Sequence, residues 1–340
     1  MVMKCISILY LAIAISSLGG CSSIVKNNVR YPSSVKLDIS GATDSEILEF
    51  YHLEEKKLSL NKEETLSYLW GNSTKITDSY NPPTFKFTAT YKGAPPGVQS
   101  VRLHNYNAGF VNKLETTAKG LIILLHSYGT SSNSVLVDNA AFQVKGYKTA
   151  IIDLMGHGKN NHSPASFGPK DIERLHFLIT QLREDNNLPL LLYGKSYGAS
   201  IAAQYIEAYG NVDGFIAVAP LTNFTKAAVT LSKSMNPILK VFISDEWLEK
   251  EVEKALQTSQ VSSEEISTPN VLQRLPANKL PPTLVLTSSI DKISNIEDVA
   301  KLAELNRVTL IDVSDHTHIE MMIFDDEFDQ HINDWLNTNF

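Results

Sequence analysis

The sequence of 340 residues predicts an α/β protein in which a mostly parallel sheet carries helices on both faces. Six continuous apolar runs, each short enough for one buried strand, lie between Gly120 and Ser314. Helical stretches separate most of these runs, and strands that alternate with helices form parallel sheets covered on both faces. One interval, about 222–280, has no strand signal and is too long for a simple crossover. We expect this interval to be a helical insertion.

The six expected strands end at small or polar residues, as strands of a buried sheet do. They are "GLIILLH" (120–126), "GYKTAIIDLMGHG" (146–158), "LPLLLYG" (188–194), "VDGFIAVAP" (212–220), "PPTLVLTSS" (281–289) and "RVTLIDVS" (307–314). The helices expected between and after them are 132–145, 171–185, 196–209, 296–305 and 328–336.

Upstream of this sheet, the pattern is less regular. Residues after Cys21 are polar and predict a tether, and apolar residues at helical spacing predict a helix over about 43–69. "NPPTFKFTATYKG" (81–93) predicts a turn and an alternating strand, with "VQSVRLHN" as a candidate partner. Residues 21–80 are therefore expected to be a tether and helical extension, and residues 81–340 the main domain.

Within the insertion, "EWLEKEVEKALQ" (246–257) predicts an amphipathic helix. Its apolar face would consist of Leu248, Val252, Ala255 and Leu256. "SSEEI" begins like a capping box, from Ser262 to Glu265. "NPILKVFI" (236–243) is more apolar than a surface loop. We expect this insertion to cover the carboxyl edge of the sheet, where open α/β sheets bind ligands.

Residues 1–20 are expected to be an export signal and not part of the fold. One cation, Lys4, precedes an apolar run over 6–18, which is too short to span a membrane comfortably. "LGGC" resembles the lipobox of bacterial lipoproteins, which implies cleavage before Cys21 and its lipidation. An ordinary cleaved signal is the alternative. The lipobox implies an exported protein anchored in the cell envelope, on the outer membrane or its periplasmic face if the cell has two membranes.

Composition excludes several classes of function. The formal net charge is −7, and Lys and Arg are scattered, so we expect no nucleic-acid partner. The chain has two cysteines, Cys5 and Cys21, both within or beside the leader, so the mature domain has no internal disulfide and no thiolate metal site. "HTHIE" (316–320) has no third ligand nearby. We expect neither metal nor cofactor.

The third strand ends in "GKSYG" (194–198), a G-x-S-x-G pattern. Because a helix follows, the context is that of a nucleophile elbow, a tight turn that presents the Ser196 hydroxyl at the sheet edge. Glycines are needed since a side chain at either flank would clash with neighbouring backbone. A chain of this length yields roughly 0.1 chance matches, so the placement supports the prediction more than the pattern does.

From about Thr84 to the C-terminus, the sequence resembles the α/β-hydrolase family, which implies that fold with a helical cap. "LLHSYGTSS" (124–132) resembles the oxyanion loop, with Ser127 in place of the usual glycine, and implies that the backbone N–H of Tyr128 is an oxyanion donor. "DLMGHGKN" (153–160) resembles the family's D-x-x-G-H-G segment. "LTSSIDKIS" resembles the strand end that carries the acid, Asp291, and "SDHTHIEMM" completes the order serine, aspartate, histidine.

Elementary chemistry requires the same parts. A serine hydroxyl needs an adjacent base, a carboxylate must orient the imidazole, and the oxyanion needs N–H donors. The backbone N–H of Tyr197, at a helix N-terminus, is one such donor. Ser196 as a relic in an inactive fold and Asp291 as a helix cap are the alternatives. His126 and His157 match structural positions of the family, and Lys195 is expected to be a packed or solvated flank.

The base has two candidates. The strand that ends near Val313 favours His316, after a short loop. The final helix favours His318, because the family places its histidine about ten residues before the first aromatic of that helix, here Phe328. Helix packing restrains this downstream distance, whereas the loop can take an insertion, so we predict His318, with His316 as the alternative.

The resemblance implies a lipid-anchored serine hydrolase that cleaves carboxylic esters or related acyl bonds through an acyl-enzyme. Its expected partners are a small acyl substrate and, through Cys21, a membrane. A peptidase or amidase of the same fold is one alternative. A binding lipoprotein that has lost the chemistry is another.

Overall fold

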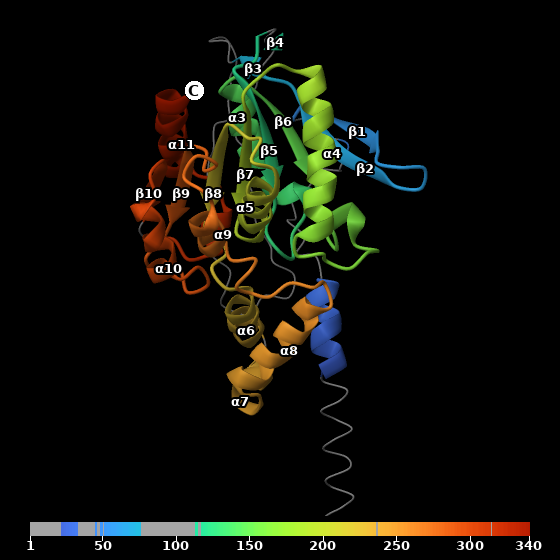
Figure 1. Cartoon of the computed structure of the whole chain (residues 1–340), viewed down its shortest axis with the longest axis vertical. Helices are drawn as coiled ribbons and strands as arrows, with labels where there is room; N and C mark the ends of the chain where they lie inside the picture. The colour runs from blue at the N-terminus through green and yellow to red at the C-terminus, as the bar shows by residue number, and fades with distance from the viewer. Residues whose placement is uncertain are drawn as a thin grey trace, which may run out of the picture.

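The computed structural model describes residues 22–32, 45, 48–49, 51–75, 113–114, 117–235, 237–313 and 315–340. The expected leader, Cys21, the strand at 81–93 and its candidate partner lie outside the described residues. Figure 1 shows a sheet with helices packed against it, and a group of helices, α6 to α8, that extends beyond one end of the sheet.

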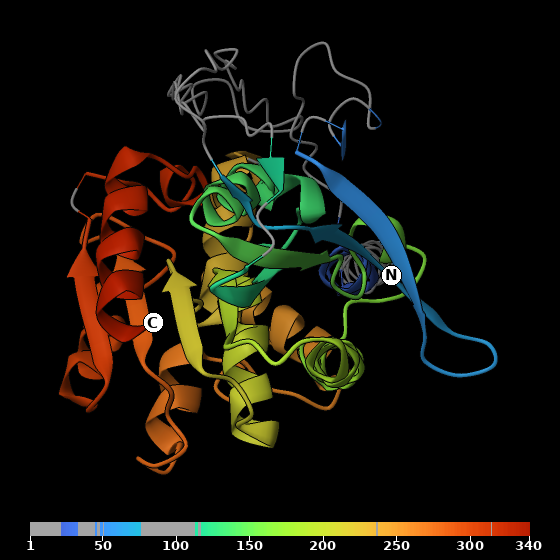
Figure 2. The same ribbon diagram turned by 90° about the horizontal axis from the view of Figure 1, so that it is seen from above.

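The main sheet has eight strands in the order β1-β2-β6-β5-β7-β8-β9-β10. From β6 to β10 every neighbouring pair is parallel, whereas β1–β2 and β2–β6 are antiparallel. The strands are β1 (Leu53–Ser59), β2 (Thr65–Gly71), β5 (Gly120–Leu125), β6 (Tyr147–Ile152), β7 (Leu190–Lys195), β8 (Gly214–Val218), β9 (Thr283–Thr287) and β10 (Val308–Asp312). All six expected strands are therefore confirmed, and Figure 2 shows how the sheet twists between its edges.

Two cores cover the two faces of the sheet. On one face, buried side chains of α4 (Pro169–Asp185), α5 (Tyr197–Tyr209) and α10 (Ile296–Ala300) pack together. On the other, α3 (Leu136–Val144) and α11 (Asp326–Asn339) do so. The expected helices over 132–145 and 296–305 each include a 3-10 turn, at Ser132–Val135 and Lys301–Glu304. The prediction of helices on both faces is confirmed.

The helix predicted over 43–69 is wrong from residue 53 onward, where β1 and β2 form a hairpin. Asn61 sets the turn, since its side-chain oxygen accepts two backbone N–H groups within the turn, each at 2.9 Å. In β2, Leu66 and Trp70 enter one core while Leu69 enters the other, as strand alternation requires. These apolar spacings fit a helix as well as a strand, and pairing with β6 decides between them.

The polar segment expected to be a tether is helical over residues 22–30. Its end is held on the domain: the Tyr128 hydroxyl donates to the Val29 carbonyl at 2.7 Å, and Ala165 N–H donates to the Arg30 carbonyl at 2.7 Å. Its start contacts α8, because the Ser22 hydroxyl donates to Glu251. The tether prediction is therefore wrong for this part of the chain. The sequence carries no local helix signal here, because the helix is held by these tertiary contacts.

Over the interval 222–280, the described residues contain helices and no strand: α6 (Phe224–Met235), α7 (Pro237–Phe242), α8 (Asp245–Gln257) and α9 (Thr268–Arg274). The apolar face predicted for α8 is buried. Ser262 and Glu265 make the hydrogen bonds of a capping box, but across a turn; α9 begins later and is capped by Ser267. Among the described helices, none is both long and apolar enough to cross a bilayer.

A candidate active site at the strand-to-helix turn

Ser196 lies between β7 and α5 with φ at 50°, a left-handed conformation that non-glycine residues rarely adopt. Its N–H donates to the Val218 carbonyl at 2.9 Å, and its carbonyl accepts from Ala199 and Ser200, which begins α5. The residue is 6% exposed. These hydrogen bonds hold the strained backbone of Ser196 in place. The tight turn directs the hydroxyl of Ser196 toward the loops at the carboxyl edge of the sheet.

The two flanking glycines are required by close backbone approach. A Cβ at Gly194 would lie 2.5 Å from the Ala199 nitrogen, within the turn itself. A Cβ at Gly198 would lie 2.2 Å from the Leu125 carbonyl oxygen at the end of β5. The second contact matters for chemistry, because it brings the first turn of α5 against the loop that follows β5.

The structure brings Ser196, His318 and Asp291 together. His318 Nε2 lies 3.1 Å from Ser196 Oγ, and His318 Nδ1 lies 2.7 Å from Asp291 Oδ2. The carboxylate can only accept when ionised, which assigns the proton of neutral His318 to Nδ1 and leaves the Nε2 lone pair facing the serine hydroxyl. This arrangement can remove a proton from Ser196.

Asp291 follows β9 after an exposed turn, and its own side chain is buried. Its Oδ1 accepts the backbone N–H groups of Ile293 and Ser294 at 2.7 and 2.9 Å, which leaves Oδ2 for His318. The following helix, α10, is capped by a different residue, Asn295. The capping alternative for Asp291 is thus not what the structure shows; its backbone contacts fix the carboxylate.

His316 faces away from Ser196 and contacts the start of α11. Its Nε2 lies 2.9 Å from Asp325 Oδ2, and Asp325 caps α11 by accepting the Phe328 N–H at 2.9 Å. The His316 ring also packs on Phe328, with centroids 5.4 Å apart. The structure therefore gives the two histidines different places, one at Ser196 and one at a helix cap.

The backbone N–H groups of Tyr128 and Tyr197 donate to no acceptor within the described part of the chain. Both tyrosine rings turn inward and meet edge to face, with centroids 5.7 Å apart. Burial raises the pKa of both phenols, so neither hydroxyl ionises near neutral pH. Ser127, which replaces the family's glycine, places its hydroxyl 2.7 Å from Met322 Sδ, in the loop that follows His318.

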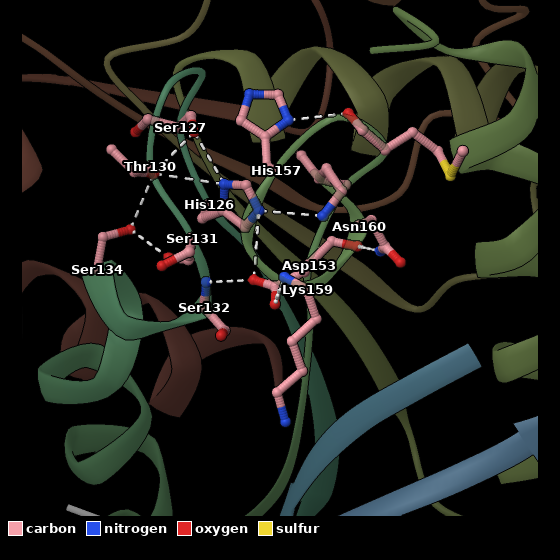
Figure 3. A network of polar contacts seen from close by, with 12 residues as sticks. His126, Ser127, Thr130, Ser131, Ser132, Ser134, Asp153, His157, Lys159 and Asn160 are labelled. Carbon is pink, nitrogen blue, oxygen red and sulfur yellow. Dashed lines mark hydrogen bonds and ion pairs between the residues drawn. The ribbon is translucent and has the colours of Figure 1, made fainter. Parts of the chain in front are cut away.

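A buried polar network supports the loop after β5 (Figure 3). Asp153 joins two loops, since Oδ1 accepts the Ser132 N–H at 2.7 Å and Oδ2 accepts the Lys159 N–H at 2.9 Å. His126 Nε2 accepts the Leu154 N–H at 3.0 Å, so its Nδ1 carries the proton and donates to the Ser127 carbonyl at 2.8 Å. The network holds the backbone on either side of Tyr128.

Both histidines in this region are structural, as expected. Burial lowers the pKa of His126, and lowers that of His157 to about 3 with the help of His126 nearby. The His157 ring packs edge to face on Tyr128 at 5.2 Å. Because both stay neutral and neither contacts Ser196 in the described residues, they support the loop and carry no proton in the reaction.

Lys195 is a packed flank of the nucleophile turn and is not solvated. It is buried under the turn, where its Nζ lies 2.6 Å from Asp138 Oδ1 of α3 and donates to the Met322 carbonyl at 3.0 Å. The Tyr193 hydroxyl donates to the same aspartate. No local pattern in the sequence pairs Lys195 with Asp138, because 57 residues separate them.

The described residues contain no group of three or more histidine, cysteine, aspartate or glutamate side chains that could hold a metal. This includes the "HTHIE" segment, whose two histidines face different partners.

Comparisons with known proteins agree with this fold. A family model described as "Serine aminopeptidase, S33" matches residues 116–280. The esterase Pf2001 of Pyrococcus furiosus is 18% identical with a TM-score of 0.56, covering 90% of this chain and 97% of its own. A membrane phospholipase A described as a bacterial virulence factor is 16% identical, TM-score 0.52, covering 97% and 96%. A candidate lipase of Acinetobacter baumannii is 16% identical, TM-score 0.53, covering 88% and 98%. No curated protein matches the chain.

Fold and strand order together define the class: the chain has the α/β-hydrolase fold. Within that class it is a serine hydrolase, with a serine at the elbow.

Proposed function

We propose that the protein is a lipid-anchored esterase that cleaves carboxylic esters through an acyl-enzyme on Ser196. His318 is the base and Asp291 orients it. The N–H groups of Tyr197 and Tyr128 stabilise the oxyanion. The observation that carries this proposal is the continuous chain from Ser196 Oγ through His318 to Asp291, with contacts of 3.1 and 2.7 Å.

The proposed reaction follows from these positions. Ser196 Oγ attacks the ester carbonyl carbon while its proton passes to His318 Nε2, and Asp291 stabilises the imidazolium through Nδ1. The carbonyl oxygen becomes negative and accepts hydrogen bonds from the two free backbone N–H groups. One such donor typically stabilises the transition state by about 2.7–4 kcal/mol. The proton then passes to the leaving alkoxide, the alcohol departs, and water repeats the sequence to release the acid.

Ester substrates are favoured by the similar structures, which are described as an esterase, a membrane phospholipase A and a candidate lipase. The matching family model, described as a serine aminopeptidase, supports a peptidase as the second candidate. A graded series of acyl esters beside aminoacyl amides separates the two. We expect turnover of esters and little turnover of amides; the reverse would favour the peptidase.

A serine-directed phosphonate tests the nucleophile. Labelling of the wild type and loss of labelling in Ser196→Ala are expected, with kcat reduced by several orders of magnitude and the unfolding transition nearly unchanged. Wild-type turnover in this variant would show that Ser196 is not the nucleophile. An unlabelled, inactive wild type would favour a binding lipoprotein instead.

The anchor is proposed from the sequence "LGGC" alone, which precedes the described residues. Cys21→Ala should abolish acylation, visible as a mass loss in the purified protein, and should leave the ester kcat of the solubilised protein unchanged. Wild-type protein that carries no acyl mass would contradict the anchor and leave the esterase proposal standing.

A further inference from the structure

We propose that the tip of the helical insertion is a membrane-docking surface, which turns the active site toward esters held in a lipid bilayer. We call this surface the α7 tip: Val241 and Phe242 of α7 with neighbouring Lys240, and Trp247 in the first turn of α8. The proposal rests on the proposed ester hydrolysis for its substrate, but not for the docking itself.

The α7 tip exposes large apolar side chains that do not pack into the core of the protein. Val241 is 73% exposed and Phe242 76%, more than any other large apolar side chain in the described residues. They are adjacent and follow an exposed lysine, and Trp247 nearby is half-buried. An aromatic residue, an aliphatic residue and a cation at the end of a helix form the composition that interfacial helices use in headgroup regions.

The place where the N-terminal segment meets the domain indicates that a lipid bilayer covers the α7 tip. Helix 22–30 lies beside α8, at the end of the molecule to which α7 extends (Figure 1). Its first residue, Ser22, donates to Glu251 of α8. In the sequence, Cys21 and an apolar run over 6–18 come directly before Ser22. Whether the apolar run is kept or replaced by lipid on Cys21, the hydrophobic attachment begins at the end of the protein that carries the α7 tip.

The attachment and the α7 tip support each other. A single small apolar surface binds a bilayer weakly. Attachment through the N-terminal segment raises the effective concentration of the bilayer at the α7 tip and so strengthens its binding. Ile24, 60% exposed on helix 22–30, adds apolar surface at the same end. Two contacts also restrict rotation, so that the insertion would face the bilayer and the sheet would point away.

The insertion links this surface to the catalytic residues. Phe224 begins α6 and packs edge to face on Tyr128, whose N–H is the proposed oxyanion donor, at a centroid distance of 4.9 Å. The α6 helix packs on α7 and α8. A docked α7 tip would therefore place the helical insertion beside the active site next to the lipid. This position favours acyl esters presented by the bilayer over dissolved esters.

The test uses the full-length protein, reconstituted into vesicles of phosphatidylethanolamine and phosphatidylglycerol that contain a fluorogenic long-chain ester. The variant is Val241→Ser with Phe242→Ser, and the matched control is Phe177→Ser, a 42% exposed aromatic on α4. The double variant should hydrolyse the vesicle ester about tenfold or more slowly, since two apolar side chains lose their burial in lipid. Rates on dissolved acetyl ester should stay within about twofold, and the control should match the wild type on both substrates.

Quenching by brominated lipids reads docking without activity. Emission from Trp247 should be quenched in the wild type, and less in the double variant. Trp247→Phe identifies the share of Trp247 in the signal against the other two tryptophans, Trp70 and Trp335. Equal quenching and equal vesicle rates in variant and wild type would overturn the proposal. A variant that changes only the sedimentation mass would show that the α7 tip joins two copies of this chain. Quenching as expected, with no hydrolysis of either ester, would refute the esterase and keep the docking.

Discussion

The buried ion pair beneath the nucleophile gives the sharpest stability prediction. Lys195 and Asp138 are both almost inaccessible to solvent, and the lysine also donates to the Met322 carbonyl. Lys195→Met keeps the length and apolar stem of the side chain but removes the cation. Asp138 would then keep one side-chain donor, the Tyr193 hydroxyl, among its described contacts.

The magnitude follows from burial. Breaking a buried pair by removing one partner costs about 3–5 kcal/mol, because an uncompensated charge stays in the interior. This is a large share of the 5–15 kcal/mol by which ordinary domains are stable. The second variant, Lys195→Met with Asp138→Asn, removes the orphaned charge while the amide oxygen still accepts from Tyr193. We expect it to recover at least half of the lost free energy of unfolding.

Urea unfolding, followed by tryptophan fluorescence and circular dichroism, measures both variants against the wild type. Asp138→Asn alone completes the double-mutant cycle, which isolates the pairwise energy. A loss below about 1 kcal/mol in Lys195→Met, or a double variant no more stable than the single one, would refute the reasoning. Either result would mean that water or a rearranged neighbour satisfies the carboxylate.

Two further predictions concern histidines. His318→Ala should lower kcat on a soluble ester about 10⁴-fold or more, since triad members act as a unit, whereas His316→Ala should mainly weaken the start of α11 and shift the unfolding midpoint; an active His318→Ala would overturn the assignment. For pH, burial lowers the pKa of His126 and lowers that of His157 to about 3, so below pH 6.5 the unfolded chain binds protons that the folded chain does not. The free energy of unfolding should therefore decrease as the pH is lowered, by up to about 1.4 kcal/mol per histidine for each pH unit. Asp171, whose pKa burial raises to about 6, opposes this trend below that pH; a flat urea-unfolding profile between pH 7.5 and 6 would contradict the prediction.

Local patterns were sufficient for the central sheet and the elbow. Strands β5 to β10 are apolar runs that end in small or polar residues, and that signal exists only where both faces are buried. Gly194, Ser196 and Gly198 could be read together because the turn they form is itself local. The hairpin β1–β2 escaped the same reasoning, since the spacing of Leu66, Leu69 and Trp70 fits a helix and a strand equally.

The sequence by itself therefore determined the parallel sheet, the helices that cover it, the nucleophile turn and the pair of candidate bases. Only the tertiary structure decided which histidine meets Ser196, because that depends on the path of a loop between β10 and α11. It also decided that Lys195 pairs with Asp138 across 57 residues. It placed helix 22–30 beside α8 as well. Each of these contacts joins residues far apart along the chain, and no periodicity within one segment encodes where another segment will pack.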